Sequence, residues 1–265
     1  MSGLSRSTPA VILLSLAASL PACAPKCLEL PTGAGTPYAD MAPAYAEAVK
    51  ECRGVRTMQA TLGLSGRAGT TALRGNVDAG FEAPDRIRLE GRHPLGRPVF
   101  ILVAGGGRST LYMPRDDRVL RDVPPESIVE ALVGVSLAPG ELRSLVSGCG
   151  FGVGEPAQGR EYTAGYVAVD VAGSTTYLRR EQNVWRVVAA TRPPLTLLYS
   201  DFAGGRATTL RLVATGTPRA DLTVRLSDVN INVPMEDAVF AVDVPARAQP
   251  LTLDELRRAG PLGGE

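Results

Sequence analysis

Apolar and polar residues alternate along most of the chain after Val55, and a period of two residues predicts half-buried β-strands. The first such stretch places four apolar side chains on one face, at Met58, Ala60, Leu62 and Leu64. Segment 85–91 repeats the pattern, with Ile87 and Leu89 facing inward between charged residues. The alternation predicts further strands at 73–81, 98–104, 108–113, 161–171, 175–180, 184–191, 195–202, 207–214 and 221–231.

Two segments have helical spacing instead. Residues 38–52 are rich in alanine and predict a helix, which Pro43 starts or kinks. Residues 124–147 predict two short helices, the second of which has Pro139 near its first turn. Their apolar residues recur every three to four positions: Ile128, Leu132 and Val133 in the first helix, and Leu142, Leu145 and Val146 in the second.

A run of antiparallel strands that is interrupted by two short helices predicts a mainly β fold, in which a curved sheet carries a helical cover. A sheet that is closed or nearly closed can hold a ligand in its interior. The interior is aliphatic, because aromatic residues make up only 5% of the chain. This suits an ordinary core and a lipid-binding cavity equally well. The candidate cavity or lid residues are Leu89, Ile128, Leu132, Leu142, Leu145, Leu222, Val224 and Leu226.

The first residues follow the order of a bacterial export signal. Arg6 precedes an apolar run at 10–20, which is short for a membrane-spanning helix, since such a helix needs about 20 apolar residues. Leu20, Ala22 and Cys23 then resemble the bacterial lipobox, which implies that Cys23 begins the mature chain and carries acyl groups. An uncleaved N-terminal helix, or an ordinary signal with a coincidental cysteine, is the alternative.

The chain divides into four parts on this basis. A signal peptide covers residues 1–22, and a lipidated N-terminus with a tether rich in proline, glycine and threonine covers 23–37. One mainly β domain follows at 38–246, and residues 247–265 form a C-terminal tail. The formal net charge of +1 provides no global electrostatic field that would attract nucleic acid.

If Cys23 is acylated, three cysteines are left, and an exported protein in an oxidising compartment would pair two of them. Cys27 with Cys52, and Cys52 with Cys149, are both possible pairings. The spacing between Cys23 and Cys27 is a poor zinc pattern, because a tetrahedral site needs four nitrogen or sulfur ligands. We therefore expect no metal site.

The sequence also lacks an assembled set of catalytic residues. No G-x-S-x-G nucleophile motif occurs, and a catalytic triad would have to be built around His93, the one histidine. The glycine-rich stretches at 104–108 and 147–154 match neither a phosphate-binding loop nor a dinucleotide-binding loop. We expect no enzyme activity, no catalytic residues and no cofactor.

Residues 87–148 read as a strand, a P-L-G loop, a second strand and the helical pair with L-V-G-V-S-L-A-P-G-E-L. This order is similar to that of the LolB family, the outer-membrane receptors of bacterial lipoprotein sorting. The matching positions are Pro94, Leu95, Gly96, Gly134, Pro139, Leu142 and Gly148. The C-terminal part resembles the periplasmic carrier LolA, with Asn232, Pro234, Phe240 and Pro245.

The resemblance implies an incomplete antiparallel barrel with a helical lid over an apolar cavity that receives acyl chains. It also implies that Leu95, in the loop of Pro94, Leu95 and Gly96, helps to pass lipoprotein into the membrane. Burial of this leucine in lipid would stabilise the contact by about 1.5–3 kcal/mol. Alternatively, Leu95 folds back over the barrel mouth as a plug. The chain departs from the LolB pattern where the loop continues as R-P-V-F and where the C-terminus is longer.

Two functional hypotheses follow. In the first, a lipid-anchored, periplasm-facing protein binds the acyl chains of lipoproteins or similar apolar cargo, with a LolA-like carrier as a possible partner, and helps to insert them into the membrane. Ala24 after the lipidated cysteine, in place of aspartate, favours the outer membrane of a Gram-negative bacterium. In the second, a structural or sensory envelope lipoprotein on the same fold binds a protein partner or a lipid signal.

Overall fold

The computed structural model describes residues 29–92, 98–260 and 262. The first half of the sheet is a meander, in which each strand pairs antiparallel with the next. Its strands are β2 (Thr57–Ala68), β3 (Thr71–Glu82), β4 (Arg86–Arg92), β5 (Phe100–Gly105), β6 (Arg108–Met113) and β7 (Arg118–Arg121).

The second half is another antiparallel meander. Its strands are β8 (Pro156–Tyr162), β9 (Tyr166–Val171), β10 (Ser174–Glu181), β11 (Val184–Arg192), β12 (Leu195–Ala203), β13 (Arg206–Ala214) and β14 (Ala220–Ile231). The two meanders join where β14 pairs with β2. Two-residue strands complete the sheet, with β1 (Thr36–Pro37) beside β8 and β15 (Gln249–Pro250) parallel to β7.

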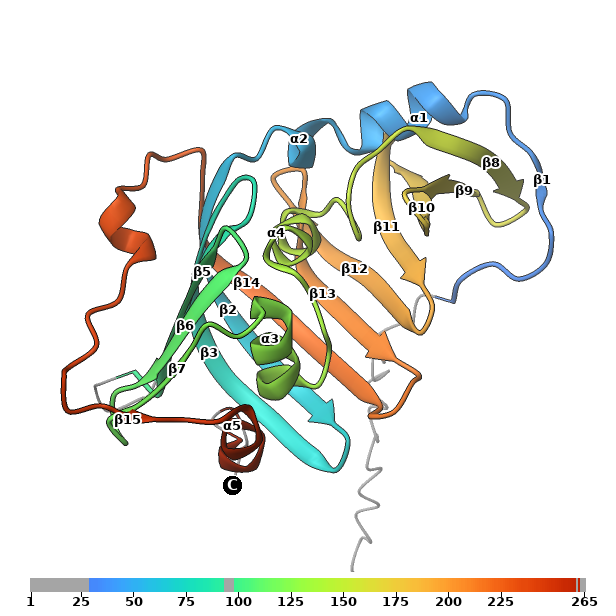
Figure 1. The fold of residues 1–265 in the computed structure, drawn as a ribbon. Coiled ribbons are helices and arrows are strands. Elements are labelled where there is room, and N and C mark those ends of the chain that lie inside the picture. The colour runs from blue at the N-terminus through green and yellow to red at the C-terminus, as the bar shows by residue number, and fades with distance from the viewer. Residues whose placement is uncertain (1–28, 93–97, 261, 263–265) are drawn as a thin grey trace, which may run out of the picture.

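The result, within the described residues, is one strongly curved sheet that does not close, since β1 forms one edge and β15 the other. The helices are α1 (Met41–Ala48), α2 (Lys50–Arg53), α3 (Pro125–Val133), α4 (Pro139–Ser147) and α5 (Leu253–Ala259), with a 3₁₀ turn η1 (Asp237–Phe240). Figure 1 shows α3 and α4 inside the hollow of the sheet. The predicted mainly β fold with a helical cover, an incomplete antiparallel barrel, is confirmed.

The position of α3 and α4 follows from the strand order. These helices connect β7 to β8, and those two strands lie near opposite edges of the sheet. The connecting chain therefore crosses the concave face, and its apolar stripe packs onto the sheet. Gly134 and Gly148 end α3 and α4 in the left-handed region, with φ of 76° and 95°, which glycine adopts without strain.

Three local features differ from the sequence prediction. The single strand predicted at 161–171 is two strands, because a turn after Tyr162, with Gly165 at φ 77°, separates β8 from β9. The short strand β7 has no predicted counterpart. The predicted helix 38–52 is divided into α1 and α2, with Pro43 in the first turn of α1, where proline is tolerated.

The C-terminal residues described as a tail in the sequence prediction are packed against the domain. β15 joins the sheet edge, and Leu256 of α5 is fully buried.

At the end of β14, the Asn232 side chain accepts a hydrogen bond from the Arg56 N–H at 2.8 Å and donates one to the Gly54 carbonyl at 3.0 Å. These contacts fasten the end of β14 to the start of β2.

A disulfide joins Cys52 of α2 to Cys149, just after α4, with their Cα atoms 5.6 Å apart. Of the two pairings that the sequence left open, this is the one in the structure. Cys27 lies outside the described residues. The bond spans 97 positions of the sequence, so it restricts a long loop of the unfolded chain.

Replacement of both cysteines, as Cys52→Ser with Cys149→Ser, is expected to lower the free energy of unfolding by roughly 2–5 kcal/mol, the usual effect of losing a native disulfide. Urea denaturation of the oxidised protein measures the change. Cys27→Ser is the control and leaves the urea midpoint in place. A double variant that unfolds at the wild-type urea concentration would contradict a stabilising role for this bond.

Candidate functional site

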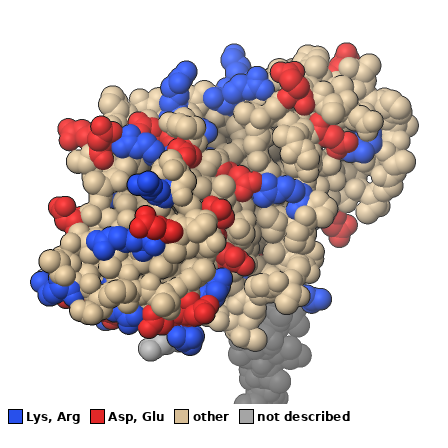
Figure 2. Space-filling view, in the orientation of Figure 1, with Lys and Arg blue, Asp and Glu red and all other residues tan. Residues whose placement is uncertain are grey.

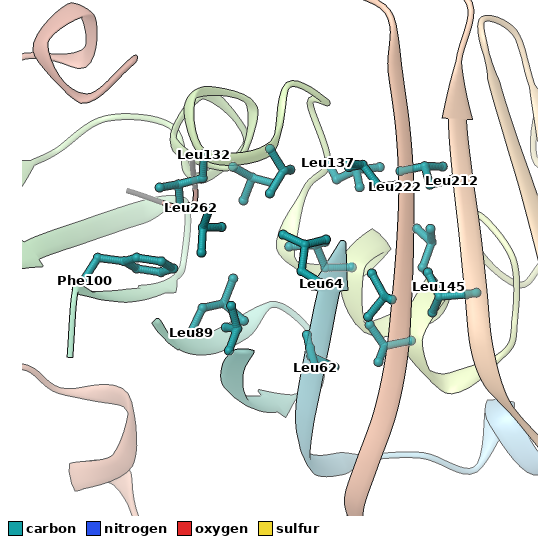
Figure 3. A pocket seen from close by; sticks show the side chains of 17 residues that line it. Leu62, Leu64, Leu89, Phe100, Leu132, Leu137, Leu145, Leu212, Leu222 and Leu262 are labelled. Carbon is teal, nitrogen blue, oxygen red and sulfur yellow. The ribbon is translucent and has the colours of Figure 1, made fainter. Parts of the chain in front are cut away.

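An apolar cavity of about 110 Å³ lies between the concave face of the sheet and helices α3 and α4. Among the residues that the structure describes, seventeen side chains line it, and all of these are leucine, valine or phenylalanine (Figure 3). Such a lining offers water no hydrogen-bond partner, and apolar cavities of this kind take apolar ligands. The cavity is the candidate binding site.

The sheet supplies one wall of the cavity through alternate residues of neighbouring strands. Side chains two positions apart on a strand point to the same face. Three strands each contribute such a pair: Leu62 and Leu64 from β2, Leu210 and Leu212 from β13, and Leu222 and Val224 from β14. Val77 of β3 and Leu89 of β4 extend this wall.

The helices supply the opposite wall. Each helix presents residues at positions i, i+3 and i+4, which lie on one face of an α-helix. They are Val129, Leu132 and Val133 from α3, and Leu142, Leu145 and Val146 from α4, with Leu137 from the connection between them. Pro139 occupies the first turn of α4.

Phe100 of β5 and Leu262 also line the cavity (Figure 3). The Phe100 ring lies over Gly91 of the adjacent strand β4, and a Cβ at residue 91 would come within 2.7 Å of the ring atom Cδ1. Glycine at 91 is therefore what lets this ring reach the cavity.

Six of the eight candidate cavity or lid residues line the cavity: Leu89, Leu132, Leu142, Leu145, Leu222 and Val224. The other two do not. Ile128 is fully buried in the core beside its neighbour Val129, which takes the lining position. Leu226 is half-buried against the core, farther along β14 than the cavity reaches.

The sequence prediction missed several lining residues for different reasons. The alternation along the predicted strands could have identified four of them, namely Leu62, Leu64, Leu210 and Leu212. No local pattern identifies Leu262, because the sequence predicts a tail at 247–265. Nothing in the local pattern distinguishes Phe100 from an ordinary core residue.

Polar contacts fix α4 to the sheet. The Tyr199 hydroxyl of β12 donates a hydrogen bond to the Leu145 carbonyl at 2.8 Å and accepts one from the Gly150 N–H at 3.1 Å. Burial raises the pKa of Tyr199 well above its ordinary value, so its hydroxyl keeps the proton that it donates. Arg143 donates to the Val55 carbonyl at 2.9 Å, and the disulfide holds the chain just after α4.

An ion pair between Glu141 of α4 and Arg192 of β11 fixes the other end of that helix. Burial of Glu141 raises the pKa of its carboxyl group. Hydrogen bonds from Arg192 and from the Ala138 N–H outweigh that effect, and the net pKa is below its usual value. The carboxylate is therefore charged at neutral pH and accepts the Ala138 bond at 3.0 Å.

Helix α3 has no comparable anchors. Among the residues that the structure describes, its side chains make no hydrogen bond and no ion pair, so apolar packing holds it in place. Ile128, Val129 and Leu132 provide that packing, and α3 also contacts α5. The two helices that cover the cavity are thus held very differently.

The charged side chains do not suggest a second kind of site. Figure 2 shows acidic and basic residues interspersed over the visible face. Within the described ranges, no three histidine, cysteine, aspartate or glutamate side chains are placed to hold a metal ion. No helix among these same residues has the length and apolar character needed to span a bilayer.

Several predicted sites lie outside the described residues. They are the lipidation residue Cys23, the loop of Pro94, Leu95 and Gly96, and the cysteine Cys27. They stay predictions from the sequence.

No model of a known protein family matches the sequence, and no curated protein matches it. Solved structures do match the fold. A LolA superfamily protein from Nitrosomonas europaea is 12% identical, with a TM-score of 0.50, and the match covers 76% of this chain and 96% of that one. A DUF1329 family protein from Desulfovibrio piger is also 12% identical, with a TM-score of 0.49, and the match covers 75% and 96%.

The similarity to the Nitrosomonas protein shows that the chain has a LolA-like fold. The resemblance of residues 87–148 predicted a fold of this kind, and the fold is confirmed. A narrower assignment to the LolB receptors stays a prediction.

Gly91→Ala is expected to lower the free energy of unfolding by about 1–3 kcal/mol, because the new methyl group overlaps the Phe100 ring and displaces it. Urea denaturation measures the loss. The double variant with Phe100→Leu should recover part of it. Gly63→Ala in β2 is the matched control, since its Cβ would approach no atom closer than 3.5 Å. Equal losses at positions 91 and 63 would refute the overlap.

Proposed function

We propose that this protein is a lipid-anchored envelope protein that binds acyl chains of lipoproteins, or similar apolar cargo, between its sheet and helices α3 and α4. Cys23 carries the anchor, and the domain faces the periplasm from the outer membrane. The protein works by burying its cargo and catalyses no covalent reaction. It helps to insert the cargo into the membrane, as the receptors that residues 87–148 resemble do.

The cavity lining is the observation that carries this proposal. All seventeen side chains are apolar, so each methylene of a bound chain would leave water for a hydrocarbon-like surface. That transfer is favourable by about 0.8 kcal/mol per methylene. The same lining disfavours polar ligands, because a buried polar group without a partner costs free energy.

Cargo enters by displacement of α3. A cavity of about 110 Å³ is smaller than the roughly 150 Å³ apolar cavity that accommodates a benzene-sized ligand, so a long acyl chain needs more space than the closed form offers. Helix α4 is fixed by a disulfide, an ion pair and buried hydrogen bonds, whereas α3 is held by apolar contacts alone among the described residues. A bound acyl chain replaces those apolar contacts with its own.

A second function is a structural or sensory role on the same fold, with a protein partner or a lipid signal as the ligand. The small volume of the cavity favours it, since most of the interior is already filled by the protein's own side chains. Mass spectrometry of protein purified from membranes distinguishes the two. Acyl species that co-purify support the carrier function, and a ligand-free domain supports the structural function.

Val224→Trp is expected to weaken the binding of a fluorescent fatty acid at least tenfold, because the indole fills space at a half-buried position of the cavity wall. Fluorescence titration of the purified mature protein measures the dissociation constant.

Val184→Trp is the matched control, since Val184 is 41% exposed and lies outside the cavity lining. It should bind like the wild type. Thermal melts of both variants show whether they fold. A folded Val224→Trp protein with wild-type affinity would exclude this cavity as the acyl site.

Leu95→Glu is expected to slow the transfer of lipoprotein into vesicles about tenfold or more, since a charged side chain removes the 1.5–3 kcal/mol that a leucine contributes when it enters lipid. A vesicle transfer assay measures the rate. Val153→Glu is the control, because Val153 is 42% exposed in another part of the chain. Unchanged transfer by the Leu95→Glu protein would show that this loop has no role in insertion.

A further inference from the structure

The C-terminal segment, residues 249–260 with Leu262, runs from the sheet edge to the cavity, and we call it the C-terminal strap. β15 pairs with β7, and the Gln249 and Leu251 N–H groups donate to the Asp117 and Val119 carbonyls at 2.7 Å. Figure 1 shows the strap continuing from β15 to α5, which lies below α3.

The first half of the strap is held by polar contacts near the protein surface. Arg118 of β7 donates to the Pro250 carbonyl at 3.0 and 2.7 Å and forms an ion pair with Glu255 at 2.9 Å. Glu255 also accepts bonds from the N–H and the hydroxyl of Thr252. The Thr252 N–H, Arg118 and the Thr252 hydroxyl lower the pKa of Glu255 to about 2, so this anchor stays charged at any physiological pH.

The second half of the strap is apolar and reaches the cavity. Leu256 is fully buried, and α5 contacts α3. Leu262 is only 5% exposed and lines the cavity together with Phe100 and Leu132, as Figure 3 shows. Its carbonyl accepts a hydrogen bond from the Arg74 N–H at 3.0 Å, which fixes the residue against β3.

Leu262 differs from the rest of the lining in where it comes from. Every other described lining residue lies between Leu62 and Val224, in the strands, the two cavity helices or the connection between them. Leu262 is contributed by the chain end, after a helix that packs on the less anchored lid helix α3. A different side chain at position 262 would therefore alter the cavity wall and leave the strands of the sheet as they are.

We propose that Leu262 is a stopper that sets the length of the apolar chain the cavity admits. The strap carries the stopper, and its polar anchors at Arg118 hold it at a fixed distance from the sheet edge. The proposal rests on the proposed function, since it assigns a length limit to the acyl chain bound in the same cavity. A smaller residue at 262 lengthens the cavity, and a larger one shortens it.

The test is displacement of a fluorescent fatty acid by saturated fatty acids of increasing chain length, with the purified mature protein. In the wild type, affinity rises with each methylene up to a limit and then levels off. Leu262→Ala should move this limit to a longer chain, and each added methylene should tighten binding about fourfold, which corresponds to 0.8 kcal/mol. Leu262→Trp should move the limit to a shorter chain.

Leu253→Ala is the matched control, because Leu253 packs on the core from the same strap but does not line the cavity. It should keep the wild-type limit. A variant that ends at Gly260 lacks Leu262 altogether. It tests whether Leu262 sets the chain-length limit if the Leu262→Ala protein does not fold. Its limit should also lie at a longer chain.

The outcomes distinguish failure of the role proposed for Leu262 from failure of acyl-chain binding by the cavity. If the wild type binds fatty acids and neither Leu262→Ala nor the shortened chain moves the limit, the stopper is wrong and the cavity function stands. A shift of the same size in Leu253→Ala also overturns the role of Leu262. A wild-type protein that binds no fatty acid overturns the proposed function, and the stopper with it.

Discussion

The pairing of β14 with β2 is the constraint on which the rest of the structure depends. It joins the last long strand to the first, from Ala220 opposite Ala68 to Ile231 opposite Met58, and so makes one sheet from two meanders. The first strand of one meander, β2, pairs with the last strand of the other, β14, so β7 and β8 lie toward opposite edges of the sheet. The helices between β7 and β8 must therefore cross the hollow of the sheet. The cavity is the space that this crossing leaves between sheet and helices.

Much of this arrangement is predictable from the sequence, because alternation and helical spacing are local signals. The strand containing Leu222 and the helix containing Leu132 were both identified, and both residues line the cavity. What could not be predicted depends on contacts between distant segments. Ile128 and Val129 are both apolar neighbours on one helix, and only the docked orientation of α3 decides which of them meets the cavity. The position of Leu262 depends on a strap that pairs with a strand more than a hundred residues earlier.

The cavity combines one fixed wall with one that is less restrained. Helix α4 is held by a disulfide just after it, by an ion pair and by a buried hydrogen bond, and the hydrogen bond weakens steeply when its geometry is disturbed. Helix α3 relies on apolar packing, which is not directional and can be exchanged for equivalent contacts with a ligand. The inner half of the strap combines such packing with the hydrogen bond from the Arg74 N–H to the Leu262 carbonyl. A site built in this way can change its volume while the sheet stays as it is.

The two edge strands of the sheet have a consequence for self-association. β1 and β15 are each two residues long, and each contains a proline, Pro37 and Pro250, which has no N–H to donate to another strand. Long unprotected edges allow copies of a protein to pair strand to strand, and short edges with proline discourage it. Within the described residues, the outermost strands of this open, strongly curved sheet therefore offer only a short template for pairing with another copy.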